Sequence, residues 1–154
     1  MRAVAQRVRS ASVSVDGRVC AEIGPGLCVF AAAGRGDEPS DVAYVADKLA
    51  GLRIFPAAPG SAGPARMQRS PLESGAALLL VPQFTLYGDV RRGRRPDFTA
   101  AASAEEGRAL LVALADRLRA AGLPVAEGVF GADMVVRADG DGPVTILLDS
   151  RRIF

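Results

Sequence analysis

The stretch Ala76–Gly88, AALLLVPQFTLYG, decides the fold of this chain. Its first half is an unbroken apolar run that ends at Pro82, and a short run bounded by turn-forming residues is typical of a strand buried on both faces. Proline cannot donate to a sheet ladder, so regular pairing should loosen there. The strand delivers Gln83 and Thr85 to the end of a rigid core element. That placement suits catalysis, although both side chains could equally bond only to loop backbone.

The patterns on either side of this stretch predict an α+β fold with sheets covered by helices. Asp16-Gly17 is the two-residue signal of a type I′ hairpin. One amphipathic helix is expected to begin at an N-cap at Ser40, and a second begins at the S-x-x-E capping box of Ser103 and Glu106. The other expected strands are 2–9, 12–15, 18–23, 27–33, 125–130, 134–137 and 144–148, with a long loop at 55–75 and a tight turn at 139–143.

Composition predicts a soluble, cytoplasmic protein. The 154 residues favour a single domain, 1–154, and 49% hydrophobic with 23% charged residues is ordinary for a globular chain. No apolar run approaches the length of a membrane span, and the first residues, MRAVAQRV, lack a secretory signal. Cys20 and Cys28 are too far apart for a redox motif, so we interpret both as small core hydrophobes.

The chain contains 0 histidines, which limits its chemistry. It excludes a Ser-His-Asp triad, a Cys-His pair and a histidine-ligated metal site. No Cys, Asp or Glu cluster stands at metal-like spacing in the sequence, so we expect no metal and no cofactor. If the protein is an enzyme, its base is a carboxylate, the substrate or water.

Basic charge gathers in one loop, directly after the stretch that decides the fold. Lys48 is the only lysine, and the densest cluster of arginines is Arg91, Arg92, Arg94 and Arg95. The planar guanidinium suits phosphate, so this cluster is a candidate phosphate contact. The alternative is a solvated loop with no partner.

Eight segments together resemble the D-aminoacyl-tRNA deacylase family from end to end, and their order and spacing make the match specific. They are AVAQRV (3–8), ASVSVDG (11–17), EIGPGL (22–27), LRIF (52–55), PQFTL (82–86), RRGRRPDF (91–98), FGADM (130–134) and DGPVT (141–145). The resemblance implies a homodimer with a barrel-like core of mostly antiparallel sheets under two main helices. It implies hydrolysis of the ester between a D-amino acid and tRNA, with the achiral glycyl ester also accepted.

Two family signature motifs carry over to this chain. One falls on Gln83, Phe84, Thr85 and Leu86, and the other on Gly142–Thr145. In the family the bond corresponding to Gly142-Pro143 is cis, and the dipeptide enters the partner subunit's active site, where its carbonyl oxygens leave no room for an L side chain. Steric rejection of a side chain predicts that the glycyl ester, which has no side chain, is accepted.

The resemblance also assigns the supporting residues. Arg7 matches an arginine that helps hold the dipeptide, while Phe130 and Met134 match positions lining the pocket for the terminal adenosine. Thr145 is assigned to substrate binding. Within this reading, the arginine cluster, by its charge and its place beside the site, is the candidate contact to tRNA phosphates.

An aminoacyl ester is already activated, so a site without histidine can hydrolyse it. The neighbouring ribose hydroxyl can assist water, while the protein positions the ester and stabilises the oxyanion. Backbone N–H groups around Phe84 and Thr85 are the candidates for that role. Thr85 could instead be a nucleophile, but no base to activate it is evident nearby in sequence.

Two residues depart from the family pattern. Pro82 stands where serine is usual, and Gly140 stands where asparagine is usual. An animal subgroup of relaxed chirality, acting on L-alanyl-tRNA, carries P-Q at the first position. That activity, and a catalytically silent module that binds the tRNA end, are the two alternatives to D-specific hydrolysis.

Overall fold

The apolar run forms β6 (Ala77–Pro82), a central strand of the sheet in the computed structural model, which describes residues 1–58 and 67–153. Leu78 and Leu80 face the core beneath the helices, whereas Leu79 and Val81 belong to a second core on the opposite face. Successive side chains of a strand point to opposite faces, so both faces of an apolar run are buried. The predicted strand with two buried faces is confirmed.

Strands and helices alternate irregularly along the chain. They are β1 (Arg2–Val15), β2 (Arg18–Ile23), β3 (Gly26–Ala32), α1 (Pro39–Gly51), β4 (Phe55–Pro56), β5 (Met67–Arg69), α2 (Pro71–Ser74), β6, the 3-10 helix η1 (Phe84–Tyr87), α3 (Ala104–Ala120), β7 (Val125–Glu127) and β8 (Val135–Asp149).

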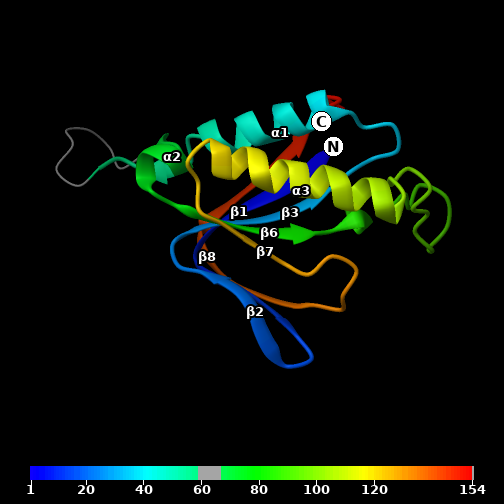
Figure 1. Cartoon of the computed structure of the whole chain (residues 1–154), viewed down its shortest axis with the longest axis horizontal. Helices are drawn as coiled ribbons and strands as arrows, with labels where there is room; N and C mark the ends of the chain where they lie inside the picture. Colours follow the sequence, from blue (N-terminus) through cyan, green and yellow to red (C-terminus); the bar gives the residue numbers. More distant parts are fainter. Residues whose placement is uncertain (59–66, 154) are drawn as a thin grey trace.

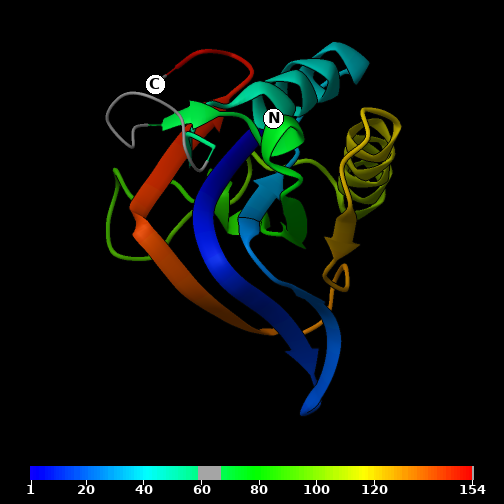
Figure 2. The same cartoon turned by 90° about the vertical axis from the view of Figure 1, so that its left-hand side faces the viewer.

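The main sheet has the order β2-β1-β3-β6-β7, and β8 pairs with β1. Figure 1 shows α1 and α3 side by side over one face, and Figure 2 shows the strands curling beneath them into a nearly closed barrel. The predicted α+β class with a barrel-like core and two main helices is confirmed. The sheet is mixed, because β6 pairs in parallel with both β3 and β7.

β1 organises the sheet, because it pairs with β2, β3 and β8, and β8 pairs along it from Arg2 to Ser14. The strands predicted at 2–9 and 12–15 are therefore one strand. The tight turn predicted at 139–143 is wrong. Val8 pairs with Gly140 and Gln6 with Thr145, so the four residues 141–144 bulge out opposite Arg7 and β8 continues in the same direction.

Three further expectations are corrected. Helix α1 begins at Pro39 with Glu38 as its N-cap, not Ser40, because Glu38 and Asp41 form a reciprocal capping box. The loop predicted at 55–75 contains β4, β5 and α2, while its residues 59–66 lie outside the described part. Of the two thiols only Cys28 is buried, whereas Cys20 is exposed on β2.

The hairpin at Asp16-Gly17 and the capping box of α3 are confirmed. Asp16 and Gly17 both have positive φ, as a type I′ turn requires, and Ser103 accepts a hydrogen bond from the Glu106 N–H. No helix in the described part of the chain is long and apolar enough to cross a membrane.

Candidate active site

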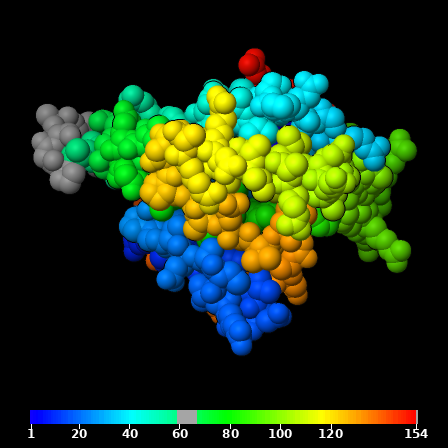
Figure 3. Space-filling model, viewed as in Figure 1, coloured from blue at the N-terminus to red at the C-terminus, as the bar shows by residue number. Residues whose placement is uncertain are grey.

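A cavity of about 630 Å³ opens where β6 ends. Its walls come from the end of β3, the β6–η1 junction, the loop at 98–102, the first turns of α3 and the segment between β7 and β8. In Figure 3 the surface is hollowed between yellow α3 and the orange segment that follows β7. The site residues brought together here are Gln83, Phe84, Phe130 and Met134, with Pro82, Phe98, Ala102, Ser103 and Gly107 among the others that line the walls.

The 3-10 turn η1 presents backbone donors at this cavity. The Gln83 N–H still donates to Ala31 O at 2.8 Å, and the Leu86 and Gly88 N–H groups close the turn onto Gln83 and Thr85 carbonyls. The first amides of a helix have no partner within it. No hydrogen-bond acceptor is found for the N–H groups of Phe84 and Thr85 among the described residues. Two adjacent amides are therefore available to an oxyanion.

The side chains of the turn are polar beside an exposed aromatic ring. Gln83 Nε2 donates to Thr85 Oγ1, and this hydrogen bond fixes the side-chain amide and the hydroxyl relative to each other. Phe84 is 59% exposed and meets Phe98 edge to face, with ring centroids 5.1 Å apart. An exposed large aromatic residue at a cavity mouth offers a surface for an apolar or aromatic group.

The opposite wall holds Phe130 and Met134. The Phe130 ring lies beside Gly107 of α3, where an added Cβ would come within 3.8 Å of the ring, and the guanidinium carbon of Arg108 lies 4.6 Å from the ring centroid. Met134 Sδ would lie 3.0 Å from a Cβ on Gly128. Helix α3 therefore packs against one side of the Phe130 ring, and Gly107 and Gly128 leave the cavity open beside Phe130 and Met134.

Arg7 and the bulge of β8 form a second group that does not line this cavity. Arg7 Nε lies 2.8 Å from Asp141 Oδ2, but its N–H does not point along this contact, so the pair is ionic rather than hydrogen-bonded. Arg7 Nη1 donates to Ile54 O. The bond between Gly142 and Pro143 is cis, and both residues are exposed.

Gly142 is the one position of the bulge that requires glycine. Its φ is +130°, which L side chains rarely adopt. An added Cβ would lie 2.7 Å from Val144 Cγ2 and 3.3 Å from Arg7 Nη2. Gly140, by contrast, has open space around it, so the usual asparagine would fit there. Thr145 Oγ1 meets Gln6 Nε2 at 3.5 Å, on the strand and outside the cavity.

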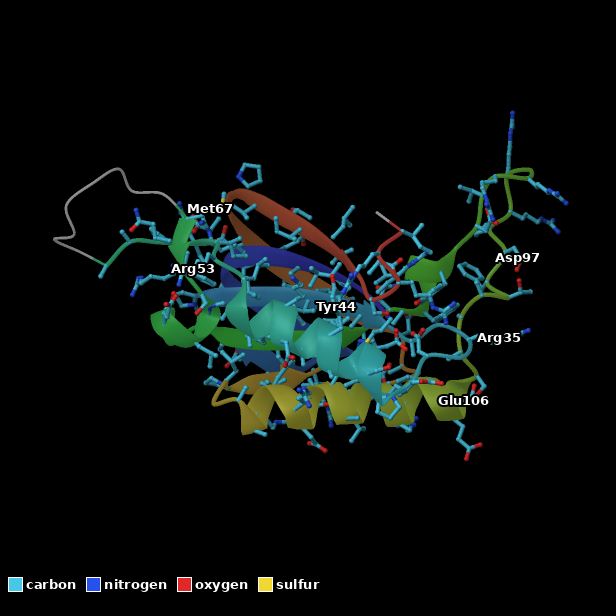
Figure 4. The ribbon with its side chains drawn as sticks, turned by 90° about the horizontal axis from the view of Figure 1, so that it is seen from above. Arg35, Tyr44, Arg53, Met67, Asp97 and Glu106 are labelled. Carbon is cyan, nitrogen blue, oxygen red and sulfur yellow. The ribbon has the colours of Figure 1, made fainter. Side chains whose placement is uncertain are left out.

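The arginine loop projects from the end of the molecule where η1 lies. Figure 4 labels Asp97 at its base, at the end opposite Arg53 and Met67. Arg91 is engaged within the loop, because its Nε lies 2.9 Å from Asp89 Oδ1, and this bonding lowers the pKa of the Asp89 carboxyl to about 2. The structure records no ion pair to Arg92, Arg94 or Arg95 within residues 1–58 and 67–153.

Metal ligands are not gathered anywhere in the described residues, since no group of three or more Cys, Asp or Glu side chains could hold an ion there. Sequence reasoning missed Phe98, Ser103 and Gly107 as cavity residues. Ser103 was predicted only as a helix cap, and Gly107 gave no signal beyond being a glycine inside a helix.

The family model and the sequence relatives agree on one family. The model of the family described as D-Tyr-tRNA(Tyr) deacylase matches residues 4–149. A D-aminoacyl-tRNA deacylase of Anaeromyxobacter dehalogenans is 51% identical over 100% of both chains, and one of Heliobacterium modesticaldum is 49% identical over 98% of this chain and 97% of its own.

Two solved structures share the fold. A c-Myc DNA unwinding element binding protein superposes with a TM-score of 0.89 at 34% identity, covering 97% of this chain and 98% of that one. A probable eukaryotic D-amino acid tRNA deacylase gives a TM-score of 0.79 at 19% identity, covering 96% and 97%, which is a likeness of fold.

Proposed function

The chain belongs to the D-aminoacyl-tRNA deacylases, hydrolases that act on aminoacyl-tRNA, and we propose that its cavity hydrolyses the ester of D-aminoacyl-tRNA to free D-amino acid and tRNA. The observation that carries the proposal is the pair of adjacent unpartnered amides of Phe84 and Thr85, of which Phe84 lines the cavity together with Phe130 and Met134. A nucleoside and a carbonyl group would thus have adjacent places in one cavity.

In the proposed mechanism the terminal adenosine enters beside Phe130 and Met134, and the ester carbonyl lies at η1. Water attacks the ester, assisted by the neighbouring ribose hydroxyl, and the Phe84 and Thr85 N–H groups donate to the developing oxyanion. Thr85 serves as scaffold, because its hydroxyl accepts from Gln83 and no base is bonded to it within the described residues.

Binding and an oxyanion hole without a general base leave about a thousand- to ten-thousandfold catalysis over water in other hydrolases. We expect acceleration of D-tyrosyl-tRNA hydrolysis of about that size. The measurement is release of labelled D-tyrosine at low enzyme concentration. Binding of charged tRNA with no acceleration would instead establish the silent tRNA-end module.

The adenosine assignment has its own test. Stacking on an aromatic side chain contributes about 1–3 kcal/mol per base. Phe130→Ala should therefore weaken binding of AMP, the probe for the terminal nucleotide, about ten- to a hundredfold, while Val129→Ala, the exposed neighbour, should leave it unchanged. Equal AMP affinity in wild type and Phe130→Ala would place the adenosine elsewhere.

We further propose that the protein is a homodimer in which Gly142 and Pro143 of one subunit close the partner's cavity against L-aminoacyl esters and admit glycyl-tRNA, including glycine mischarged on tRNA(Ala). Two observations support this arrangement. The dipeptide does not line its own chain's cavity, and Gly142 and Pro143 stand exposed on a bulge tied to Arg7.

Mixed dimers test directly whether the dipeptide of one subunit acts on the cavity of the other. One subunit carries Ala132→Trp to block its cavity, and the other carries Pro143→Ala to alter its dipeptide. If the dipeptide acts across the interface, the open cavity receives an intact dipeptide and the mixed dimer still spares L-tyrosyl-tRNA. If it acts within one chain, the mixed dimer cleaves the L ester as the Pro143→Ala homodimer does.

The arginine cluster is proposed to contact tRNA phosphates, with Arg92, Arg94 and Arg95 the most available. We also propose that the chain works as a single domain, because β8 near the C-terminus pairs along β1 at the N-terminus. A cytoplasmic location remains a prediction that follows from a tRNA substrate.

A further inference from the structure

Arg2 lies behind the 3-10 turn η1, on the side away from the substrate cavity. It stands at the start of β1, paired with Ala32 of β3 on one side and Asp149 of β8 on the other. Its Nη1 donates to Leu86 O at 3.0 Å, and its Nε lies 3.1 Å from Asp149 Oδ2. One guanidinium therefore connects the last residues of the turn to a strand of the rigid sheet.

The same guanidinium lies over the next side chain of the turn. Arg2 Cζ is 4.5 Å from the centroid of the Tyr87 ring, which is a cation–π distance. Tyr87 is only 7% exposed, and its hydroxyl would be 2.6 Å from a Cβ on Gly34, so no side chain larger than glycine fits beneath it. The ring is fixed between Gly34 and Arg2.

Asp149 in turn holds Arg2 in place. Its side chain is 2% exposed, and its second oxygen accepts the Arg151 N–H at 2.8 Å. A buried carboxylate with both oxygens engaged has one favourable arrangement, which fixes the guanidinium opposite it. Nothing in this group touches the cavity, because Arg2, Tyr87 and Asp149 are absent from its lining.

We propose that Arg2 is a positioning residue, which acts through Leu86 O and the Tyr87 ring to hold the Phe84 and Thr85 amides toward the ester. The inference rests on the proposed hydrolysis. Oxyanion donors act only when preorganised at about 2.7–3.1 Å from the developing charge. If η1 becomes more mobile, the rate of hydrolysis should therefore fall, whereas the wall formed by Phe130 and Met134 should stay intact.

The test compares Arg2→Met, which keeps the length of the side chain without its donors, with Arg2→Lys and wild type. Arg18→Met is the matched control, because Arg18 is exposed at the start of β2. We expect Arg2→Met to lower the single-turnover rate constant for D-tyrosyl-tRNA about tenfold or more, with AMP affinity within about twofold. Arg2→Lys should fall between, because an ammonium cannot reproduce the planar fork.

A purely stabilising role predicts a different pattern. Arg2→Met that is folded and retains the wild-type rate constant would overturn the proposal, and so would a parallel loss of rate and AMP affinity in both variants. If Arg2→Met does not fold, Arg2→Lys carries the comparison, with the same two outcomes.

Amide hydrogen exchange separates this inference from the proposed function. The peptide that covers Phe84–Gly88 should exchange faster in Arg2→Met, while the amides of Leu78 and Gly128, bonded to Pro124 O and Leu80 O, stay protected. If wild type hydrolyses no aminoacyl ester, the function fails and exchange alone decides whether Arg2 holds the turn. Unchanged exchange at Phe84–Gly88 would refute it.

Discussion

Arg7 and Asp141 form an ion pair, with Nε and Oδ2 2.8 Å apart, at the point where four residues of β8 bulge opposite one residue of β1. Asp141 immediately precedes Gly142, so the pair ties the exposed Gly142–Pro143 dipeptide to the sheet. Arg7 also reaches Ile54 O, which fixes its side chain from a second direction. A largely buried arginine thereby anchors the segment that we assign to chiral rejection.

Removing the Arg7 side chain should weaken discrimination against L-aminoacyl esters more than it lowers hydrolysis of the D ester. Arg7→Leu removes both the ion pair to Asp141 and the charged donor to Ile54 O. A hydrogen bond to a charged group contributes about 1.5–3 kcal/mol, so we expect the ratio of D- to L-tyrosyl-tRNA hydrolysis to fall about tenfold or more. Arg9→Leu is the control, because Arg9 is 73% exposed and 3.8 Å from the same carboxylate. An unchanged ratio in folded Arg7→Leu would contradict the assigned role.

Thr85→Ala distinguishes the scaffold from the nucleophile. The variant loses the bond from Gln83 but keeps the backbone N–H, so D-tyrosyl-tRNA hydrolysis should stay within about tenfold of wild type. The measurement is the single-turnover rate constant, with circular dichroism as the check on folding. Complete loss of hydrolysis in a folded variant would support a threonine nucleophile.

The arginine loop should give tRNA binding much of its salt dependence. Replacing Arg92, Arg94 and Arg95 by glutamine should make the slope of log K against log [salt] shallower by about 2, at about 0.7 per single-strand phosphate contact. Arg91→Gln should disturb the loop through Asp89. Arg18→Gln with Arg117→Gln, both exposed on other elements, is the control for lost positive charge. An unchanged slope in the triple variant would show a solvated loop without a partner.

Alkaline pH should destabilise the fold through Cys28. Burial raises the pKa of its thiol from 9.0 to about 11, so the unfolded chain loses this proton before the folded protein does. Stability from this group is complete below pH 9 and is lost as the pH rises from 9 to 11. Burial, with the nearby Asp37 carboxylate, also raises the pKa of the Tyr87 phenol, which adds a loss of the same sign.

Urea unfolding between pH 8 and 11 measures how steeply the free energy of unfolding falls with pH. This fall should be shallower in Cys28→Ala than in wild type, whereas Cys20→Ser, at the exposed thiol, should leave it unchanged. Identical slopes in wild type and Cys28→Ala would contradict a thiol that stays protonated in the fold.

Local signals in the sequence were sufficient for several elements, because each depends on its own residues. The apolar run of β6, the Asp16-Gly17 turn and the Ser103 cap belong to this class. The bulge at 141–144 could not be predicted, because Asp139–Pro143 has the composition of a turn and only pairing with β1 keeps it in a strand.

The candidate site divides in the same way. Gln83 and Phe84 follow a strand whose end could be located, so their place at a cavity was predictable. Phe98 and Gly107 reach the same cavity from a distant loop and from helix α3, and such packing leaves no local pattern. The anchoring of η1 by Arg2 likewise depends on residues at the start of the chain.

Hydrolysis of D-tyrosyl-, L-tyrosyl- and glycyl-tRNA at one low enzyme concentration tests the central claim most directly. The account predicts cleavage of the D and glycyl esters with the L ester spared, because rejection by backbone carbonyls acts on an L side chain and glycine has none. Cleavage of the L ester at a rate comparable to the D ester would contradict it and would establish the relaxed chirality that Pro82 first suggested.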